Sequence, residues 1–268
     1  MDWHTKYGPW ALVTGASSGI GRSFALGAAR RGLHVVLAAR REERLREVAE
    51  ACQQHGVETL IVPIDLAQEG AAATLHRACA DLEIGLLINN AGFGDFGNFM
   101  DLDVTAHGNM VRVNCLMPVQ LTSYFLKPML DRKRGGMVML SSMVGFKATP
   151  HFSLYSATKA FDRWFGAALY DEVKGAGIDV LTICPGLTDT EFFENARGRT
   201  RLFPVGKPET VAEEGLRYLG RRRVHVVGWF NKVLVVMMER WVPSRWAYPM
   251  VGWVARMNQE RGRYEKVE

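Results

Sequence analysis

Tyr155 and Lys159 stand four residues apart and offer a phenol and an amine for proton transfer. On a helix, residues at this spacing lie on the same face. A free tyrosine has a pKa of about 10, and an adjacent ammonium stabilises the phenolate and lowers that pKa. A lowered pKa suits general acid–base catalysis near neutral pH. The pair is not specific by itself, so its position in the chain, after Ser142, has to support the assignment.

A second chemical feature is the glycine-rich stretch at residues 14–21, where Gly15, Gly19 and Gly21 are spaced GxxxGxG. Glycines permit a tight turn and let the backbone approach a pyrophosphate, and the free N–H groups of a following helix favour an anion. The spacing differs from GxGxxG, and no Gly-Lys-Ser/Thr follows, which excludes a P-loop. The stretch therefore predicts a dinucleotide site, the alternative being a turn without a ligand.

The residues after the second apolar run indicate which dinucleotide is bound. A carboxylate at this position would hold the two ribose hydroxyls of NAD. This chain has Arg40 and Arg41 instead, and a guanidinium pairs well with a 2′-phosphate. We therefore expect NADP(H), with Arg40 as the phosphate ligand. The alternative is that both arginines form only a solvated helix start.

Short apolar runs alternate with amphipathic segments such as 23–31 and 42–54, and these elements have to position the residues above. The alternation predicts an α/β, doubly wound, Rossmann-like parallel sheet with helices on both faces. Residues 1–228 should form this domain, and 229–268 a C-terminal helical extension of it. The expected strands are 10–14, 35–39, 59–62, 86–88, 137–140, 179–184 and 224–228.

Six of the expected strands end in polar or turn-forming residues. Ligands of open parallel sheets bind beyond the carboxyl ends of the strands. These residues should therefore face one crevice, and that coincidence is more informative than any single motif. They are Gly15, Arg40, Asp65, Asn90, Ser142 and Pro185.

With these residues in order, the sequence resembles the short-chain dehydrogenase/reductase family over about residues 8–220. The resemblance implies a sheet of about seven strands around a nicotinamide cofactor, and hydride transfer between that cofactor and a carbonyl or secondary alcohol. The matching motifs are Thr14-Gly15-x-x-x-Gly19-x-Gly21, Asn89-Asn90-Ala91-Gly92, Asn114, Ser142, Tyr155-x-x-x-Lys159 and Pro185-Gly186-x-Thr188.

The resemblance also implies a role for each residue. Tyr155 would be the general acid/base, and Lys159 would bind the ribose and modulate the pKa of the tyrosine. Ser142 would hold the substrate oxygen, and Asn114 would support a water relay from Lys159. The implied cofactor contacts are Gly15, Ser17, Ser18, Gly19, Ile20, Gly21, Arg40, Asp65 (adenine), Leu66, Asn90, Ala91, Gly92 (adenosine ribose, with Asn90), Tyr155, Lys159, Pro185, Gly186 and Thr188 (nicotinamide amide).

The composition of the 268 residues, 48% hydrophobic and 23% charged, is ordinary for a globular protein and excludes disordered and low-complexity classes. No apolar run approaches the roughly 18 residues of a membrane span, and no secretory signal is visible at the start. The four scattered cysteines include no CxxC pair, so we expect no metal site. They indicate reduced thiols in a cytoplasmic protein.

The end of the chain departs from the family pattern, since it lacks the Gly-Gly ending that helps many relatives form tetramers. Residues 217–268 hold eleven of the basic and four of the acidic residues, and residues 229–268 hold four of the seven tryptophans. Three interpretations stay open: self-packing or a dimer contact, a lid over the substrate, and peripheral membrane contact through the tail. We expect a homodimer rather than a tetramer.

The predicted function is that of an NADP(H)-dependent oxidoreductase for a hydrophobic small-molecule carbonyl or alcohol. The alternative is a binding protein that senses NADP(H) without turnover. A nucleic-acid partner is not expected, because the basic excess is confined to the tail. Candidate substrate-pocket residues are Phe93, Phe96, Val144 and Phe152, together with Phe192, Phe193, Leu202 and Phe203 in a variable loop after Gly186.

Overall fold

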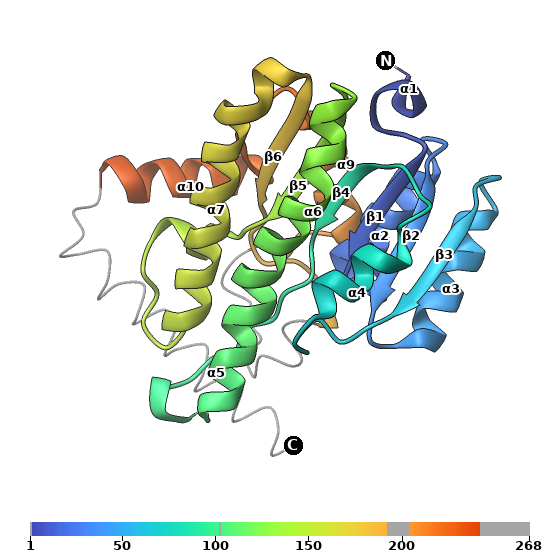
Figure 1. The fold of residues 1–268 in the computed structure, drawn as a ribbon. Coiled ribbons are helices and arrows are strands. Elements are labelled where there is room, and N and C mark those ends of the chain that lie inside the picture. The colour runs from blue at the N-terminus through green and yellow to red at the C-terminus, as the bar shows by residue number, and fades with distance from the viewer. Residues whose placement is uncertain (1, 102, 192–203, 242–268) are drawn as a thin grey trace.

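Seven parallel strands form one sheet in the order β3-β2-β1-β4-β5-β6-β7 (Figure 1). The computed structural model describes residues 2–101, 103–191 and 204–241. The strand order reverses between β1 and β4, which is the point where open α/β sheets bind ligands. The predicted fold class and strand number are confirmed. The strands are β1 (Trp10–Thr14), β2 (His34–Ala39), β3 (Thr59–Pro63), β4 (Ile84–Asn89), β5 (Gly135–Leu140), β6 (Ile178–Cys184) and β7 (Val224–Val226).

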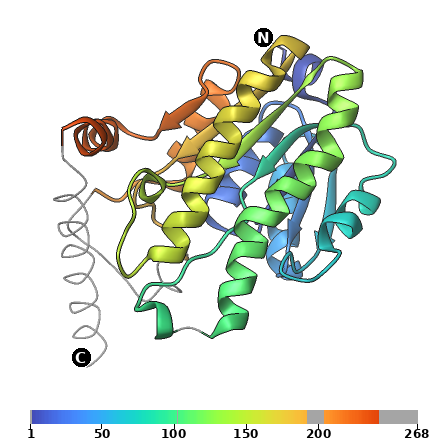
Figure 2. The same ribbon diagram turned by 60° about the vertical axis from the view of Figure 1, so that its left-hand side comes forward.

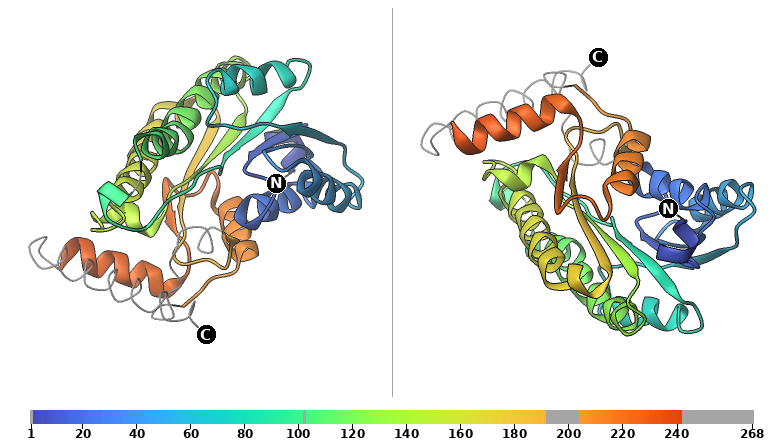
Figure 3. Two further views of the ribbon diagram at one scale, coloured as in Figure 1. Left: turned by 90° about the horizontal axis from the view of Figure 1, so that it is seen from below. Right: turned by 90° about the horizontal axis from the view of Figure 1, so that it is seen from above.

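Helices cover both faces of the sheet, with α2, α3 and α9 on one face and α4, α6 and α7 on the other (Figure 3). The helices are α1 (Trp3–Tyr7), α2 (Gly19–Ala29), α3 (Glu42–Gln53), α4 (Ala71–Ala78), α5 (Val104–Val111), α6 (Met117–Asp131), α7 (Ser153–Val173), α9 (Pro208–Tyr218) and α10 (Trp229–Arg240). The described residues also form four short helical segments, which are η1 (Phe99–Asp101), η2 (Arg112–Leu116), η3 (Met143–Phe146) and η4 (Lys174–Ala176).

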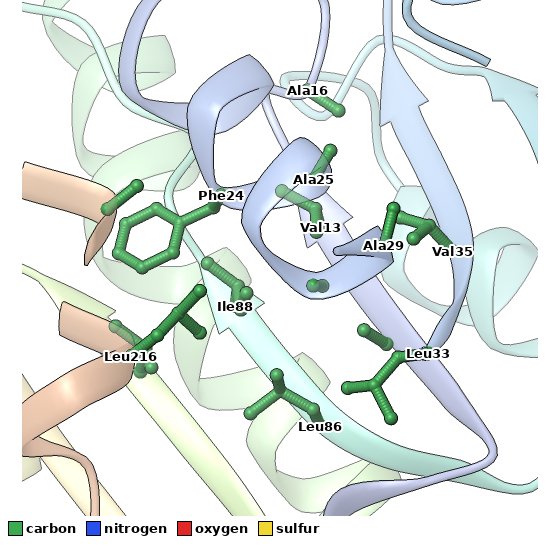
Figure 4. Close-up of a cluster of buried hydrophobic side chains, with 14 of the residues drawn as sticks. Val13, Ala16, Phe24, Ala25, Ala29, Leu33, Val35, Leu86, Ile88 and Leu216 are labelled. Carbon is green, nitrogen blue, oxygen red and sulfur yellow. The ribbon is translucent and has the colours of Figure 1, made fainter. Parts of the chain in front are cut away.

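The core consists of two apolar layers, one on each side of the sheet. Successive residues of a strand point to opposite faces. Accordingly Val13 packs in the layer beneath α2, whereas Leu12 packs in the layer beneath α4 and α6. In the first layer, Phe24 of α2 and Leu216 of α9 meet above β1 and β4 (Figure 4). Because both faces are covered, the strands are apolar throughout, which is why the sequence shows them as continuous runs.

A short N-terminal helix, α1, was not among the expected elements. It places Tyr7 in the core, 1% exposed, where the phenol donates a hydrogen bond of 2.5 Å to Asp179 of β6. Lys6 forms an ion pair with the same carboxylate. The strands provide room for the helix, since a Cβ on Gly136 would meet the Tyr7 ring at 2.8 Å. The helix thus covers the end of the sheet opposite the predicted crevice.

Residues 229–268 were expected to form a C-terminal helical extension, and the described part of this range contains α10, which follows β7 and lies outside the two helical layers (Figure 2). It packs against η3 and so reaches the carboxyl ends of β5 and β6. Residues 242–268 and the loop residues Phe192, Phe193, Leu202 and Phe203 lie outside the described residues. In the part of the chain that the structure describes, none of the helices combines the length and the apolar character that crossing a membrane requires.

Candidate active site

A cavity of about 920 Å³ opens where the carboxyl ends of β1, β2, β4, β5 and β6 meet. Its wall contains all the expected cofactor residues and the expected substrate-oxygen ligand. The parallel sheet therefore brings together residues that are up to about 170 positions apart in the chain. These wall residues are Gly15, Ser17, Ser18, Gly19, Ile20, Gly21, Arg40, Asp65, Leu66, Asn90, Ala91, Gly92, Ser142, Tyr155, Lys159, Pro185, Gly186 and Thr188.

The glycine-rich turn is closed tightly enough to exclude any larger residue at two positions. Gly15 has a φ of +66°, a conformation that L side chains rarely adopt. A Cβ on Gly21 would lie 2.2 Å from the Gly15 carbonyl oxygen and 2.5 Å from the Asn90 amide nitrogen. The turn thus leaves its backbone bare at the start of α2, which is the arrangement that accepts a pyrophosphate.

Asn90 supports this turn from the neighbouring strand. Its side-chain nitrogen donates 2.8 Å to the Thr14 carbonyl, and its backbone N–H donates 3.0 Å to the Thr14 hydroxyl. The Ala91 N–H donates to the same hydroxyl at 3.0 Å. The side-chain amide of Asn90 therefore connects the ends of β1 and β4, and the residue contributes to the cavity wall from that fixed position.

The far end of the cavity carries the two arginines that follow β2. Both line the wall, and both are exposed. Arg41, which the sequence analysis did not select, makes the contacts: its guanidinium donates 2.7 Å to Glu191 and 2.8 Å to the Ser18 hydroxyl. Arg41 holds the pKa of the Glu191 carboxyl below its usual range. This end of the cavity thus offers two guanidinium groups, one of them paired with Glu191, and is open to solvent.

Asp65 and Leu66 close the opposite side of that end. The Asp65 carboxylate accepts a 3.0 Å hydrogen bond from the Ala67 N–H and so forms the turn that follows β3. Leu66 is 5% exposed and packs in the core layer beneath α4. The pair combines a polar group with an apolar surface, a combination suited to a purine ring.

Tyr155 lies in the cavity wall, in the first turn of α7, and is 8% exposed. Its ring packs 4.5 Å from the Phe152 ring, centroid to centroid. Burial raises the pKa of Tyr155, while the Lys159 ammonium and a hydrogen bond with Ser142 act in the opposite direction. The expected lowering of that pKa is therefore outweighed in the protein alone, because desolvation of the phenolate is the larger effect.

Lys159 lies one helical turn further along α7 and is 4% exposed. Its ammonium donates 2.7 Å to the Leu140 carbonyl and 2.9 Å to the Asp162 carboxylate. The nitrogen stands 5.9 Å from the centroid of the Tyr155 ring. The Asp162 carboxylate raises the pKa of Lys159 above its ordinary value despite burial, so the side chain is an ammonium at neutral pH.

Asn114 is the one expected catalytic residue that does not line the cavity. It is 0% exposed and lies in η2, a π-helical turn between α5 and α6. Its side chain accepts 3.0 Å from the Phe93 N–H and donates 2.8 Å to the Phe93 carbonyl. It also donates 3.0 Å to the Thr158 hydroxyl of α7. The side chain therefore fixes the loop after β4 against the helix that carries Tyr155.

The loop after β6 also lines the cavity. The Thr188 hydroxyl donates 3.1 Å to the Gly186 carbonyl, and Thr188 is 4% exposed. Asn231 of α10 covers Gly186, since a Cβ there would meet its amide nitrogen at 2.6 Å. Ser142 caps η3 by accepting from the Val144 N–H at 3.4 Å. Sequence analysis missed Asn231 because its contact with this loop spans 45 residues.

The remaining wall is apolar and is the space available for a substrate. The four predicted residues Phe93, Phe96, Val144 and Phe152 all line it. Gly94 was missed, although a Cβ there would lie 2.6 Å from the Tyr155 ring. The inner face of α10 was also missed as a pocket wall, and of its residues Leu234, Val235 and Met238 line the cavity.

Residues 9–200 match the family model of the short chain dehydrogenases. The chain is 33% identical to the 7beta-hydroxysteroid dehydrogenase of Collinsella aerofaciens over 238 residues, covering 87% of this chain and 90% of that protein. It is 34% identical to the very-long-chain 3-oxoacyl-CoA reductase of Anas platyrhynchos over 220 residues, covering 80% of this chain and 69% of the relative.

Solved structures agree with these sequence matches. A structure from work on 7beta-hydroxysteroid dehydrogenase stereoselectivity superposes with a TM-score of 0.87 at 30% identity, covering 94% of this chain and 99% of its own. A short-chain dehydrogenase from Sphingobium yanoikuyae in complex with NADPH superposes with a TM-score of 0.76 at 32% identity, covering 82% of this chain and 87% of its own. The fold and site thus define an oxidoreductase that interconverts carbonyl and alcohol groups. The chain belongs to the short-chain dehydrogenase family.

Proposed function

We propose that this protein is an NADP(H)-dependent reductase of hydrophobic ketones, with Tyr155 as the general acid. One observation carries the proposal: the Tyr155 phenol, the Ser142 hydroxyl and the Lys159 ammonium lie in the wall of a cavity that also contains the bare glycine turn. A cavity of this kind accepts a dinucleotide along its length and leaves the apolar end beside Tyr155 for the substrate.

The residues present fit a nicotinamide dinucleotide. Gly15 and Gly21 leave the backbone free where a Cβ would collide, and the start of α2 offers N–H groups to a pyrophosphate. Arg40 and Arg41 offer positive charge for a 2′-phosphate, which favours NADP(H) over NAD(H). A relative with bound NADPH and a 3-oxoacyl reductase from Agrobacterium tumefaciens with NADP bound support this choice.

The bound cofactor would supply the hydride for the carbonyl carbon, and the protein supplies the remaining steps. Ser142 holds the substrate oxygen by a hydrogen bond. Tyr155 gives its phenolic proton to that oxygen as negative charge develops on it. Lys159 stabilises the resulting phenolate and binds the ribose. In the oxidative direction the same phenolate takes the proton back from the alcohol.

The substrate class follows from the aromatic wall. Phe93, Phe96 and Phe152 from the loops around Tyr155, with Leu234 and Met238 from α10, enclose apolar space. Such a wall suits a bulky ketone with little polar surface. The names of two relatives, a 7beta-hydroxysteroid dehydrogenase and a very-long-chain 3-oxoacyl-CoA reductase, indicate bulky hydrophobic substrates. This supports a hydrophobic carbonyl substrate for this protein.

The test is the Tyr155→Phe variant assayed against a panel of bulky ketones with NADPH. Loss of the acid should lower kcat by about 10²–10⁴-fold, while NADPH binding, measured by fluorescence, stays within about twofold. The control is Tyr170→Phe on the same helix, outside the cavity wall, which should keep full activity. Steady-state reduction by Tyr155→Phe at the wild-type rate would refute the assignment. Tight NADPH binding by an inactive wild-type protein would favour a sensor instead.

We further propose that the chain forms a homodimer. Apolar side chains are exposed on neighbouring elements of one side of the molecule, among them Val111, Leu116 and Tyr124 on the α5–α6 segment and Phe161 and Trp164 on α7. Trp164 alone is 67% exposed. Contiguous apolar surface of this kind supports a subunit contact. Sedimentation of the wild type against Trp164→Glu should show a dimer that dissociates in the variant, and a monomeric wild type would contradict it.

For the localisation, we propose a cytoplasmic protein that contacts the membrane peripherally through α10. The outer face of α10 exposes Trp229, Val233, Val236 and Met237, and Trp241 directly follows the helix; Trp229 is 76% and Trp241 77% exposed. Tryptophans at both ends of an apolar helical stripe suit the interface of a bilayer. Flotation with anionic liposomes tests the contact: binding that Trp229→Ser weakens supports it, and absence of binding removes it.

A further inference from the structure

Asp162 is a buried carboxylate that contacts Lys159 from behind the cavity wall, and no motif of the sequence accounts for it. It lies one helical turn after Lys159 on α7, is 4% exposed, and accepts the 2.9 Å hydrogen bond from the Lys159 ammonium. Position 162 falls on the inward stripe of α7 that also carries Tyr155, Gly166 and Leu169. An apolar residue would occupy that stripe without desolvating a charge.

The carboxylate decides where the lysine nitrogen lies. Asp162 and the Leu140 carbonyl each accept one hydrogen bond, at 2.9 and 2.7 Å. An ammonium has three N–H groups, so these two acceptors leave one for a further partner such as a ribose hydroxyl. Lys159 is thereby held between α7 and the end of β5, with its nitrogen 3.4 Å from the position that a Cβ of Gly92 would occupy.

The ionisable groups around this pair come from η2, β6, α7 and α10. Cys115 of η2 and Cys184 of β6 face it, and burial raises the pKa of Cys115 to about 11 and that of Cys184 to about 12. Both thiols are therefore neutral at physiological pH. Arg163 of α7 acts on Cys184 and pairs with Glu239 at 3.3 Å on the α10 side. The charged groups that act on the Tyr155 phenol are thus Lys159 and Asp162.

We propose that Asp162 is a positioning residue that fixes the Lys159 ammonium and offsets its charge, so that Tyr155 keeps its proton until the substrate oxygen takes it. This inference rests on the proposed function. A lone ammonium would stabilise the phenolate strongly, whereas an ammonium already paired with a carboxylate stabilises it less.

This arrangement suits the reductive direction. A carbonyl gains a hydride at carbon from the reduced nicotinamide, which becomes oxidised, and gains the phenolic proton at oxygen. Only a tyrosine that still holds its proton can complete that step. Burial already raises the pKa of Tyr155, and the Asp162 charge acts in the same direction. In the oxidative direction the tyrosine must first ionise. The Asp162 carboxylate therefore shifts the onset of alcohol oxidation to higher pH.

The experiment is the pH profile of secondary-alcohol oxidation with NADP⁺ by full-length Asp162→Asn. The amide keeps the size of the side chain and an acceptor for Lys159 but removes the charge. The acid limb of kcat should move to lower pH by about one unit relative to wild type. The matched control is Asp171→Asn, an exposed carboxylate on the same helix that pairs with Lys174 and Arg223, and its profile should coincide with wild type.

Two further measurements test whether the charge of Asp162 is responsible. Asp162→Glu retains the charge, so the acid limb of its kcat profile should stay near the wild-type position. An acid limb that shifts equally in Asp162→Glu and Asp162→Asn would overturn the proposal. The proposal would also be overturned if Asp162→Asn folds and its acid limb stays at the wild-type pH. If that variant is inactive, alkaline tyrosinate absorbance replaces turnover.

In that titration, the step that disappears on adding Tyr155→Phe should occur at lower pH in Asp162→Asn than in wild type. An equal position of the step would overturn the proposal. The titration needs no substrate, so it also separates this inference from the proposed function: a wild type that reduces no ketone refutes the reductase assignment, while the tyrosinate step still decides whether Asp162 controls Tyr155.

Discussion

Two ion pairs of nearly equal length lie at opposite ends of the cavity. At the catalytic end, the Lys159 nitrogen stands 2.9 Å from Asp162, and the two side chains are 4% and 5% exposed. At the end where we propose that the adenine binds, called the adenine end below, the Arg41 guanidinium stands 2.7 Å from Glu191, and the side chains are 46% and 36% exposed. Distance therefore does not distinguish the pairs; exposure to water does.

The difference in exposure sets what each pair can do. Water and salt screen the Arg41–Glu191 pair, and exposed pairs of this type contribute about 0–1 kcal/mol. The Lys159–Asp162 pair is shielded from water, so the loss of either partner leaves an uncompensated buried charge. The exposed end is thus able to exchange one anion for another, as cofactor selection requires. The buried end keeps fixed charges that act on Tyr155.

The largest effect should come from breaking the buried pair with Lys159→Met. We expect the free energy of unfolding to fall by about 3–5 kcal/mol at pH 7, because Asp162 is left buried and charged. The control is Lys127→Met, which breaks a Lys–Asp pair of 3.0 Å whose side chains are 79% and 67% exposed. That loss should stay below about 1 kcal/mol. Urea titration measures both, and equal losses would contradict the comparison.

The same variant carries a pH dependence whose sign is fixed. Burial raises the pKa of Asp162 in the folded chain above its ordinary 3.8, and the opposing effect comes from Lys159. Lys159→Met removes that opposing effect. The folded state then binds a proton more readily than the unfolded state, so protonation stabilises it. The deficit of Lys159→Met should shrink as the pH falls from neutrality towards the unfolded-state value. A deficit that grows on acidification would show that Asp162 is not the group responsible.

A smaller effect is expected from reversing charge at the exposed end with Arg40→Asp. A charge-assisted hydrogen bond to a 2′-phosphate contributes about 1.5–3 kcal/mol. The ratio of kcat/KM for NADPH to that for NADH should therefore fall by about 10–100-fold, and more at low salt than at high salt. Arg46→Asp on α3, an exposed arginine paired with Glu42, is the control. An unchanged ratio in Arg40→Asp would assign the phosphate to Arg41 alone.

The elements of the sheet could be predicted from the sequence because each depends on local composition. Strands covered on both faces are continuous apolar runs, and the glycine turn at Gly15–Gly21 is a local pattern. The position of Ser142 follows once parallel strands are assumed, since strand ends share one edge, and Tyr155 lies on α7, the long helix that comes after the same strand. The corresponding predictions about the fold are confirmed. The roles of individual site residues stay predictions.

The contacts that could not be predicted join residues far apart in the chain. Arg41 meets Glu191 across 150 positions, and Asn231 meets Gly186 across 45. No periodicity carries such information. The π-helical turn at Asn114 was also beyond prediction, because a single extra residue in a helix leaves no compositional mark. Asp162 is a charged residue on the buried face of α7, and a charge in that place needs a partner within the core.

The smallest effect should come from releasing Arg41 with Glu191→Gln. The pair is exposed, so the free energy of unfolding should change by less than about 0.5 kcal/mol. The guanidinium that Glu191 holds becomes available to an incoming 2′-phosphate, so the KM for NADPH should fall by about two- to threefold, and the KM for NADH should not change. Glu213→Gln breaks the exposed Arg31–Glu213 contact outside the cavity and should alter neither KM. A fall in KM that is equal for both cofactors would mean that Glu191 controls entry to the cavity and not the phosphate, and the adenine end would then select its ligand through Arg40 without help from Arg41.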